Sequence, residues 1–322
     1  MSSTASLKEK AAKGLFWGGL SNSVQQLLGA VFGLITARIL NAEDYGLIGM
    51  LAIFSSVVTI LQESGFTSAL ANRKEIKHDD YNAVFWFSIL TSIAAYVILF
   101  FCAPLIASFY RTPELIPLSR ILFLGFVFGG FGVAFNAYLY KSLKVKERGI
   151  GDMIAILMSG MIGVILALNG YAAIGLAVQN VLYIGVSIFF RFYYSSWRPT
   201  FHFDFSPLRE MFSFSSKLML TNFVFQLNNN MLSVIMGRFY NANQLGFYTQ
   251  GQKWMGMASQ VVTGMISYIA QPVFVEAADN RERQRHIFRK MVRFGAFVSL
   301  PAMAWLGRGR TDYCPALCVQ YP

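Results

Sequence analysis

Basic and amide side chains within long apolar segments are the residues of this sequence best suited to chemistry. A polar residue that faces lipid costs free energy, so these side chains are expected to face a bundle interior, a partner or water. The candidates for binding a ligand are Lys253, Arg120, Lys217, Arg38, Arg238, Asn228, Gln226 and Gln26. Amides suit a hydroxyl-rich ligand in a hydrated cavity, although the same amides could instead hydrogen-bond between helices.

Lys253 is the most informative of the basic candidates. It lies seven residues after Gly246, which puts it about 10 Å from the nearer membrane surface at a rise of about 1.5 Å per residue. Cations without nearby carboxylates favour a negatively charged ligand. Arg38 and Arg238 lie at segment ends, where the alternative role is a cap or a snorkelling anchor. Arg120 and Lys217 lie a short way inside their segments, and both roles stay open for them.

Signatures of catalysis and of metal binding are missing from the sequence. The three histidines, His78, His202 and His286, fall in or near predicted loops, and the three cysteines form no disulfide or metal-binding framework. The sequence contains no glycine-rich phosphate-binding motif. It therefore predicts a protein that is not an enzyme and that uses neither a metal nor a cofactor.

The elements that carry these residues are predicted to be transmembrane helices. Of the 322 residues, 55% are hydrophobic and 13% charged, whereas about 25% of an ordinary soluble domain is charged. The apolar residues come in blocks of about 20, the length that crosses a bilayer as a helix. Nine spans are predicted, at 14–40, 46–66, 82–106, 116–140, 152–169, 171–191, 210–238, 244–272 and 289–306. Asp152, at the start of the fifth span, is expected to be its N-terminal cap.

The orientation of this all-α, polytopic bundle follows from its lysines and arginines. With the N-terminus in the cytoplasm, eighteen of them fall in the N-terminal tail and the inside loops, and only Arg111 falls in an outside loop. Such an excess marks the cytoplasmic side of a membrane protein. The formal net charge of +11 is therefore explained by topology, with anionic membrane lipid as a partner and no nucleic acid.

An internal repeat relates the first span to the seventh. Residues 20–46 and 220–246 align without a gap, with identical residues at ten positions, namely 20, 22, 24, 26, 27, 35, 38, 41, 42 and 46 and their counterparts. Six spans separate the two copies, so both enter from the same side. The sequence thus predicts two parallel repeats about an axis along the membrane normal, an arrangement typical of transporters. Ile53 occupies the position equivalent to Lys253, so the repeat itself does not require a charge there.

Several stretches, in this order and spacing, resemble one family. They are ARILNAEDYG at 37–46, ESGFTSAL at 63–70, APLIASFY at 103–110, WRP at 197–199 and GRFYNANQLGFY at 237–248. With them the chain resembles Wzx-type flippases of polysaccharide and lipopolysaccharide (O-antigen) biosynthesis, in the multidrug/oligosaccharidyl-lipid/polysaccharide exporter superfamily. The resemblance implies transport of a lipid-linked oligosaccharide, an undecaprenyl-pyrophosphate glycan, across the bacterial inner membrane. It also implies two alternating lobes of six helices, a basic central cavity, and a polysaccharide polymerase and export machinery as partners.

The chain departs from this family pattern in its second half. We expect a complete first lobe of six helices at 1–200 and a partial second lobe of three at 201–306. The apolar pattern breaks after about Met303, and 307–322 is interpreted as an aberrant tail produced by a frameshift or truncation. The alternatives to the flippase are a multidrug exporter of the same superfamily and an inactive truncated fragment. The drug exporter usually needs a membrane-buried carboxylate for ion coupling, and the first span contains none.

Overall fold

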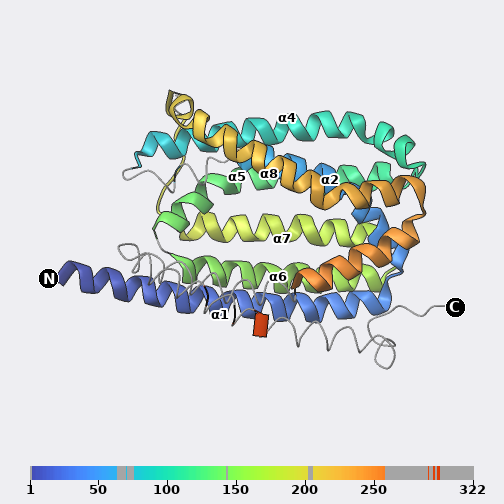
Figure 1. Ribbon diagram of the computed structural model, residues 1–322, viewed down its shortest axis with the longest axis horizontal. Helices are drawn as coiled ribbons and strands as arrows, with labels where there is room; N and C mark the ends of the chain where they lie inside the picture. The colour runs from blue at the N-terminus through green and yellow to red at the C-terminus, as the bar shows by residue number, and fades with distance from the viewer. Residues whose placement is uncertain are drawn as a thin grey trace. The chain divides into compact units, whose positions relative to one another are not determined.

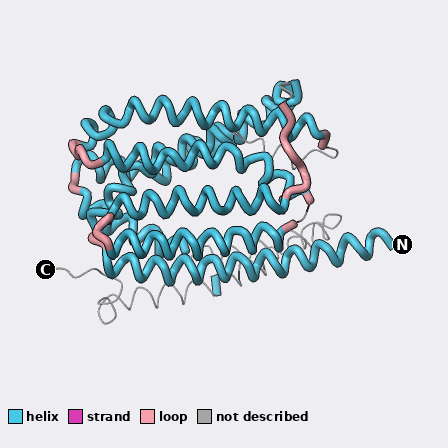
Figure 2. The backbone as a smooth tube through the Cα atoms, turned by 180° about the vertical axis from the view of Figure 1, so that it is seen from behind, coloured by secondary structure: helices cyan, strands magenta, loops and turns pink. Residues whose placement is uncertain are grey.

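The computed structural model describes residues 2–63, 70, 76–142, 144–201 and 206–257, together with positions 289, 293, 296 and 297. The chain divides into two compact units, 1–250 and 251–322, and all seven labelled helices lie in the first. The described residues form helices joined by short loops (Figures 1 and 2). The predicted all-α fold class is therefore confirmed.

Seven long helices follow one another along the chain. They are α1 (Ser2–Ile39), α2 (Ala42–Glu63), α4 (His78–Tyr110), α5 (Leu115–Lys141), α6 (Val145–Leu168), α7 (Ala172–Tyr194) and α8 (Ser206–Phe239). A further helical stretch begins at 242 and is described as far as 257. The first seven predicted spans coincide with these seven helices. The eighth is described only in part, and the ninth lies almost entirely outside the described residues.

Five of the described helices are long and apolar enough to cross a membrane, namely α2, α4, α5, α6 and α7. The helices α1 and α8 carry all three amide candidates, and these polar side chains lower their hydropathy. The total of nine spans, the lobe boundary at 200 and the interpretation of the tail stay predictions.

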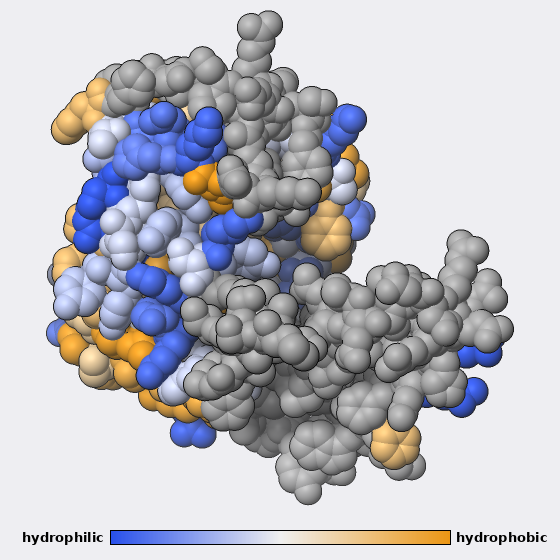
Figure 3. All heavy atoms as spheres, turned by 90° about the vertical axis from the view of Figure 1, so that its left-hand side faces the viewer, coloured by the Kyte–Doolittle hydropathy of each residue, from blue (hydrophilic) through white to orange (hydrophobic). Residues whose placement is uncertain are grey.

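The helices lie roughly antiparallel along the chain and pack side by side. Packed neighbours are α4 with α5, α5 with α7, α7 with α6, and α6 with α1, while α8 lies along α2 and α4 (Figure 1). Short connections favour such antiparallel neighbours. The first residues of α4 and α6 and the last residues of α5 and α7 therefore lie at the same end of the bundle. Figure 3 looks onto this end, where hydrophilic residues gather beside hydrophobic ones.

The two larger of three apolar clusters found among the described residues form most of the buried core. One surrounds the fully buried Leu51, Leu115 and Phe123, and the other surrounds Val84 and Ala134. Large apolar side chains also cover the outside of the helices, and Phe101 is 74% exposed. An apolar surface of this extent suits contact with lipid.

The segment after α7 is bound back onto the start of α4. Trp197 is buried among the rings of Tyr81, Phe85 and Phe135. The Trp86 indole donates to the backbone oxygen of Thr200 at 2.8 Å, and the backbone amide of Thr200 donates to the Asn82 side chain at 3.0 Å. The connection that follows the predicted first lobe is thus held to that lobe as far as Thr200.

Candidate functional site

A cavity of about 510 Å³ lies within the first six helices, between α2, α5 and α7. Ligand pockets in proteins usually measure about 300–1,000 Å³. Its polar lining consists of hydroxyls, amides and one guanidinium, contributed by Ser55, Ser56, Thr59, Gln62, Asn136, Asn180, Tyr183, Ser187 and Arg191. Apolar side chains such as Phe126 and Ile184 complete the wall. The described lining contains no carboxylate, so it suits a neutral or anionic hydroxyl-rich ligand better than a cation.

Three glycines on one face of α5 shape this cavity. A Cβ atom at Gly129 would lie 3.3 Å from the Gln62 Oε1 atom, and one at Gly132 would lie 2.8 Å from Ile188. A Cβ atom at Gly125 would lie 3.0 Å from the tip of Ile184. The spacing of four and then three residues repeats on one side of a helix. It lets α2 and α7 approach α5 closely while the neighbouring polar side chains line the space between them.

Some polar groups of the lining are satisfied and others are not. Gln62 donates from Nε2 to the Ser92 hydroxyl at 2.8 Å and to the Phe126 backbone oxygen at 2.6 Å. In contrast, Asn136 Oδ1 and Arg191 Nε are buried without a hydrogen-bond partner among the described residues. Leaving a buried polar atom unpaired is costly. A ligand or water in the cavity can supply the missing partners, one a donor and the other an acceptor.

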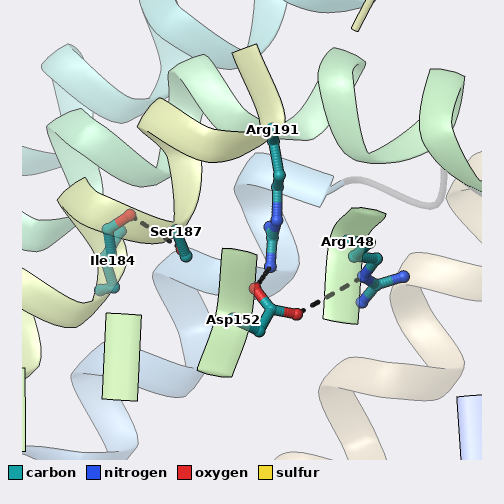
Figure 4. A network of polar contacts seen from close by, with 5 residues as sticks. All are labelled: Arg148, Asp152, Ile184, Ser187 and Arg191. Carbon is teal, nitrogen blue, oxygen red and sulfur yellow. Dashed lines mark hydrogen bonds and ion pairs between the residues drawn. The ribbon is translucent and has the colours of Figure 1, made fainter. Parts of the chain in front are cut away.

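An ion-pair cluster holds Arg191 at one end of the cavity (Figure 4). The Arg191 Nη2 atom lies 3.1 Å from Asp152 Oδ1, and the Arg148 Nε atom lies 3.8 Å from Asp152 Oδ2. The prediction that Asp152 caps its helix was wrong, because α6 begins at Val145 and continues through Asp152. Asp152 instead joins α6 to α7 as the counter-ion of Arg191.

Sequence reasoning missed this cluster. Arg191 is the last residue of the predicted span 171–191, and it lies in the last turn of α7 with its side chain 18% exposed. The available signal was a pair of opposite charges, Asp152 and Arg191, near the same end of two consecutive spans. Such pairs are expected wherever charges enter the membrane.

Within the unit 1–250, the predicted basic candidates occupy separate places. The Arg120 guanidinium lies 4.2 Å from the centre of the Phe100 ring, and the Arg238 guanidinium lies 5.5 Å from the centre of the Phe109 ring. Arg38 is exposed in the last turn of α1, and Lys217 is exposed on α8. Lys253 is exposed on the helical stretch 251–257, within the second unit.

The predicted amides lie on α1 and α8. Gln226 accepts hydrogen bonds from Asn229 and Asn230, and Asn230 also donates to the Ser56 hydroxyl at 3.3 Å. Asn228 is exposed on α8, and Gln26 is half-buried on α1. Within the unit 1–250, none of the predicted candidates lines the cavity of the first six helices. The link between the cavity and α8 is the hydrogen bond from Asn230 to Ser56, which lines the cavity.

Comparison with known proteins identifies the family. Residues 35–308 match the family model described as polysaccharide biosynthesis protein. The chain belongs to this polysaccharide biosynthesis family. The predicted family resemblance is therefore confirmed.

Two proteins with names from polysaccharide biosynthesis are similar in sequence to this chain. The chain is 25% identical over 314 residues to the lipopolysaccharide biosynthesis protein WzxC of Escherichia coli strain K12, covering 96% of this chain and 63% of the relative. It is 25% identical over 249 residues to the teichuronic acid biosynthesis protein TuaB of Bacillus subtilis strain 168, covering 77% and 52%. The chain thus spans between about half and two thirds of the length of these relatives.

Solved structures of similar fold are transporters. The inward-facing conformation of a multidrug resistance MATE family transporter of the MOP superfamily matches with a TM-score of 0.67 and 17% identity, covering 93% of this chain and 75% of the other. The outward-facing conformation of such a transporter matches with a TM-score of 0.63 and 18% identity, covering 96% and 73%. At these identities the likeness establishes the fold that this family member adopts.

Proposed function

We propose that this chain acts in a flippase that carries lipid-linked oligosaccharides, as undecaprenyl-pyrophosphate glycans, across the bacterial inner membrane for surface polysaccharide biosynthesis. The observation that carries the proposal is the match of residues 35–308 to the polysaccharide biosynthesis family. The names of the relatives give it further support, since they include a succinoglycan biosynthesis transport protein, ExoT of Rhizobium meliloti strain 1021, 23% identical over 287 residues. A transporter of this kind catalyses no reaction and needs no cofactor.

The geometry of the first six helices supports a hydroxyl-rich substrate. The cavity presents hydroxyls and amides from three helices on a partly apolar wall. Glycan hydroxyls both donate and accept hydrogen bonds, so they can pair with the free Asn136 oxygen and the free Arg191 N–H. We infer that part of the glycan occupies this cavity during transport.

The basic candidates suit the charged part of the substrate. Lys253, Arg120, Lys217, Arg38 and Arg238 are proposed to attract the pyrophosphate or an acidic glycan. The N-terminus and the basic loops are proposed to face the cytoplasm, where the polar end of the bundle in Figure 3 would meet anionic headgroups. A polysaccharide polymerase and the export machinery are the proposed downstream partners.

Deletion of the gene in its own host tests the proposal. We expect the deletion strain to lose surface polysaccharide and to accumulate lipid-linked oligosaccharide, and a plasmid copy to reverse both effects. Drug susceptibility should not change. Normal polysaccharide together with increased drug susceptibility would instead support a multidrug exporter.

A further inference from the structure

Arg191 is only partly engaged by its ion pair with Asp152. A guanidinium presents its N–H donors as a planar fork, which can bind a carboxylate through two parallel hydrogen bonds. Here the Arg191 Nη2 atom donates to Asp152 Oδ1 at 3.1 Å, while Asp152 Oδ2 lies 3.8 Å from the Arg148 Nε atom (Figure 4). Asp152 is thus shared between two arginines, and it offers Arg191 a single oxygen.

The rest of the Arg191 guanidinium belongs to the wall of the cavity. The Nε atom is buried, and none of the described residues accepts a hydrogen bond from it. The side chain lines the cavity, and the described lining contains no carboxylate that could serve as a second partner. Because a buried charge with an unpaired donor is costly, this arrangement favours one further acceptor, which a ligand can supply.

Helix α5 leaves room beside this guanidinium. A Cβ atom at Gly132 would lie 4.0 Å from Arg191 Nη1 and 2.8 Å from Ile188, so a larger residue would fill the space. Asn136 follows one turn later on the same face of α5, and its Oδ1 atom is buried and unpaired. Since the last residues of α5 and α7 lie at the same end of the bundle, both unpaired atoms belong to one end of the cavity.

The two unpaired atoms require different partners. Arg191 Nε needs an acceptor, and a carboxylate suits it better than a hydroxyl because a charge-assisted hydrogen bond is about twice as strong as a neutral one. Asn136 Oδ1 needs a donor, which an ionised carboxylate cannot provide but a hydroxyl can. A ligand that satisfies both atoms therefore carries a carboxylate and a hydroxyl close together.

Further polar groups follow Arg191 along α7 into the cavity. Asn180, Tyr183 and Ser187 precede Arg191 at helical spacing, and all of them line the cavity. The Ser187 hydroxyl donates to the Ile184 backbone oxygen at 2.9 Å, so its oxygen is left to accept from a ligand. This row suits additional hydroxyls on the same ligand, as a sugar ring provides.

We propose that Arg191 and Asn136 form a subsite for an acidic sugar of the glycan, such as a hexuronate. Arg191 pairs with the sugar carboxylate, and Asn136 accepts a hydrogen bond from a neighbouring hydroxyl. Asp152 is a positioning residue, because it orients the guanidinium and does not line the cavity. The inference rests on the proposed function for the natural ligand, but binding of an acidic sugar can be measured without transport.

Calorimetry with simple probes tests the subsite. The purified full chain in detergent micelles would be titrated with D-glucuronate, D-glucose and acetate. We expect glucuronate to bind about ten-fold or more tightly than glucose, because only glucuronate offers Arg191 a charged acceptor. It should also bind more tightly than acetate, which lacks the hydroxyls. Equal binding of glucuronate and glucose, or of glucuronate and acetate, would overturn the subsite, as would no binding of glucuronate.

Two variants show whether Arg191 carries the preference. In Asp152→Asn/Arg191→Gln the preference for glucuronate over glucose should disappear, and removing both charges avoids leaving Asp152 unpaired. Arg148→Gln is the matched control, because Arg148 belongs to the same ion-pair cluster but does not line the cavity. This control should keep the preference. A double variant that kept it, or a control that lost it, would overturn the assignment to Arg191.

A transport measurement distinguishes the subsite from the proposed function. The chain would be expressed in flippase-null strains that make a lipid-linked glycan either with or without an acidic sugar. We expect at least ten-fold more surface polysaccharide from the acidic glycan than from the neutral one. Equal delivery of both would overturn a role of the subsite in selecting substrate. If neither glycan is delivered although glucuronate binds as expected, the proposed function fails and the binding data still support the subsite.

Discussion

Removing the charge of Asp152 should destabilise the bundle strongly. Its side chain is 8% exposed and pairs at 3.1 Å with Arg191, which is 18% exposed. Asp152→Asn keeps the size of the side chain but leaves the Arg191 cation without its counter-ion. Breaking a buried pair from one side costs about 3–5 kcal/mol.

The expected change in melting temperature follows from this cost. A destabilisation of about 1 kcal/mol lowers the melting temperature of a domain of about 200 residues by about 2–4 °C. We therefore expect Asp152→Asn to melt about 6–20 °C below the native protein in detergent micelles, measured by circular dichroism or by size-exclusion chromatography after heating.

Two further variants distinguish loss of the Asp152–Arg191 ion pair from a general effect of removing a charge. Arg148→Gln removes the more distant and more exposed partner, at 3.8 Å and 38% exposed, so it should cost no more than about 1 kcal/mol. The double variant Asp152→Asn/Arg191→Gln removes both charges and should recover much of the lost stability. If Asp152→Asn melted together with the native protein, the ion pair would not hold α6 to α7, and the reasoning would be refuted.

Three other variants address the cavity, the connection and the basic candidates. Asn180→Leu places an apolar side chain in the cavity and should lower transport at least ten-fold, measured by surface polysaccharide staining, while the amount of protein in the membrane stays unchanged. Normal staining would exclude the cavity from the transport path. Trp197→Ala should cost about 3–5 kcal/mol, seen as a lower melting temperature, because Trp197 fills an aromatic cluster and is 7% exposed. Lys253→Ala should reduce translocation without loss of membrane insertion, and native flux in this variant would remove Lys253 from the proposed site.

The positions of the helices could be predicted from the sequence. The long apolar blocks mark α1, α2 and α4 to α8, because only helices satisfy the backbone in lipid. Their ends were less accurate, since helices extend into polar sequence wherever capping and packing allow. For example, α6 begins at Val145 rather than near Asp152.

The cavity could not be predicted in the same way. It depends on α2, α5 and α7 lying side by side, and the separation of Gln62, Asn136 and Asn180 along the chain contains no such information. The amide candidates on α1 and α8 were chosen from their polarity alone. Polarity shows that a residue avoids lipid, but not whether it faces a cavity or a neighbouring helix. Asn230, for example, faces a neighbouring helix and donates a hydrogen bond to Ser56.

The repeat was the sequence feature with the most spatial information. The shared Asn-Ala and glycine at 41–46 and 241–246 predicted equivalent positions, and the structure places these positions against each other. What the alignment could not show is that the glycines meet the other copy's backbone. That contact depends on the crossing of two helices and not on the residues of either one.

We propose that this chain moves lipid-linked oligosaccharide across the membrane. The most direct measurement compares the deletion strain with and without the plasmid-borne gene, by quantifying lipid-linked oligosaccharide in the inner and outer leaflets of isolated inner membranes. We predict that the intermediate remains in the inner leaflet without the gene and reaches the outer leaflet with it. An equal distribution between the leaflets in both strains would contradict the claim.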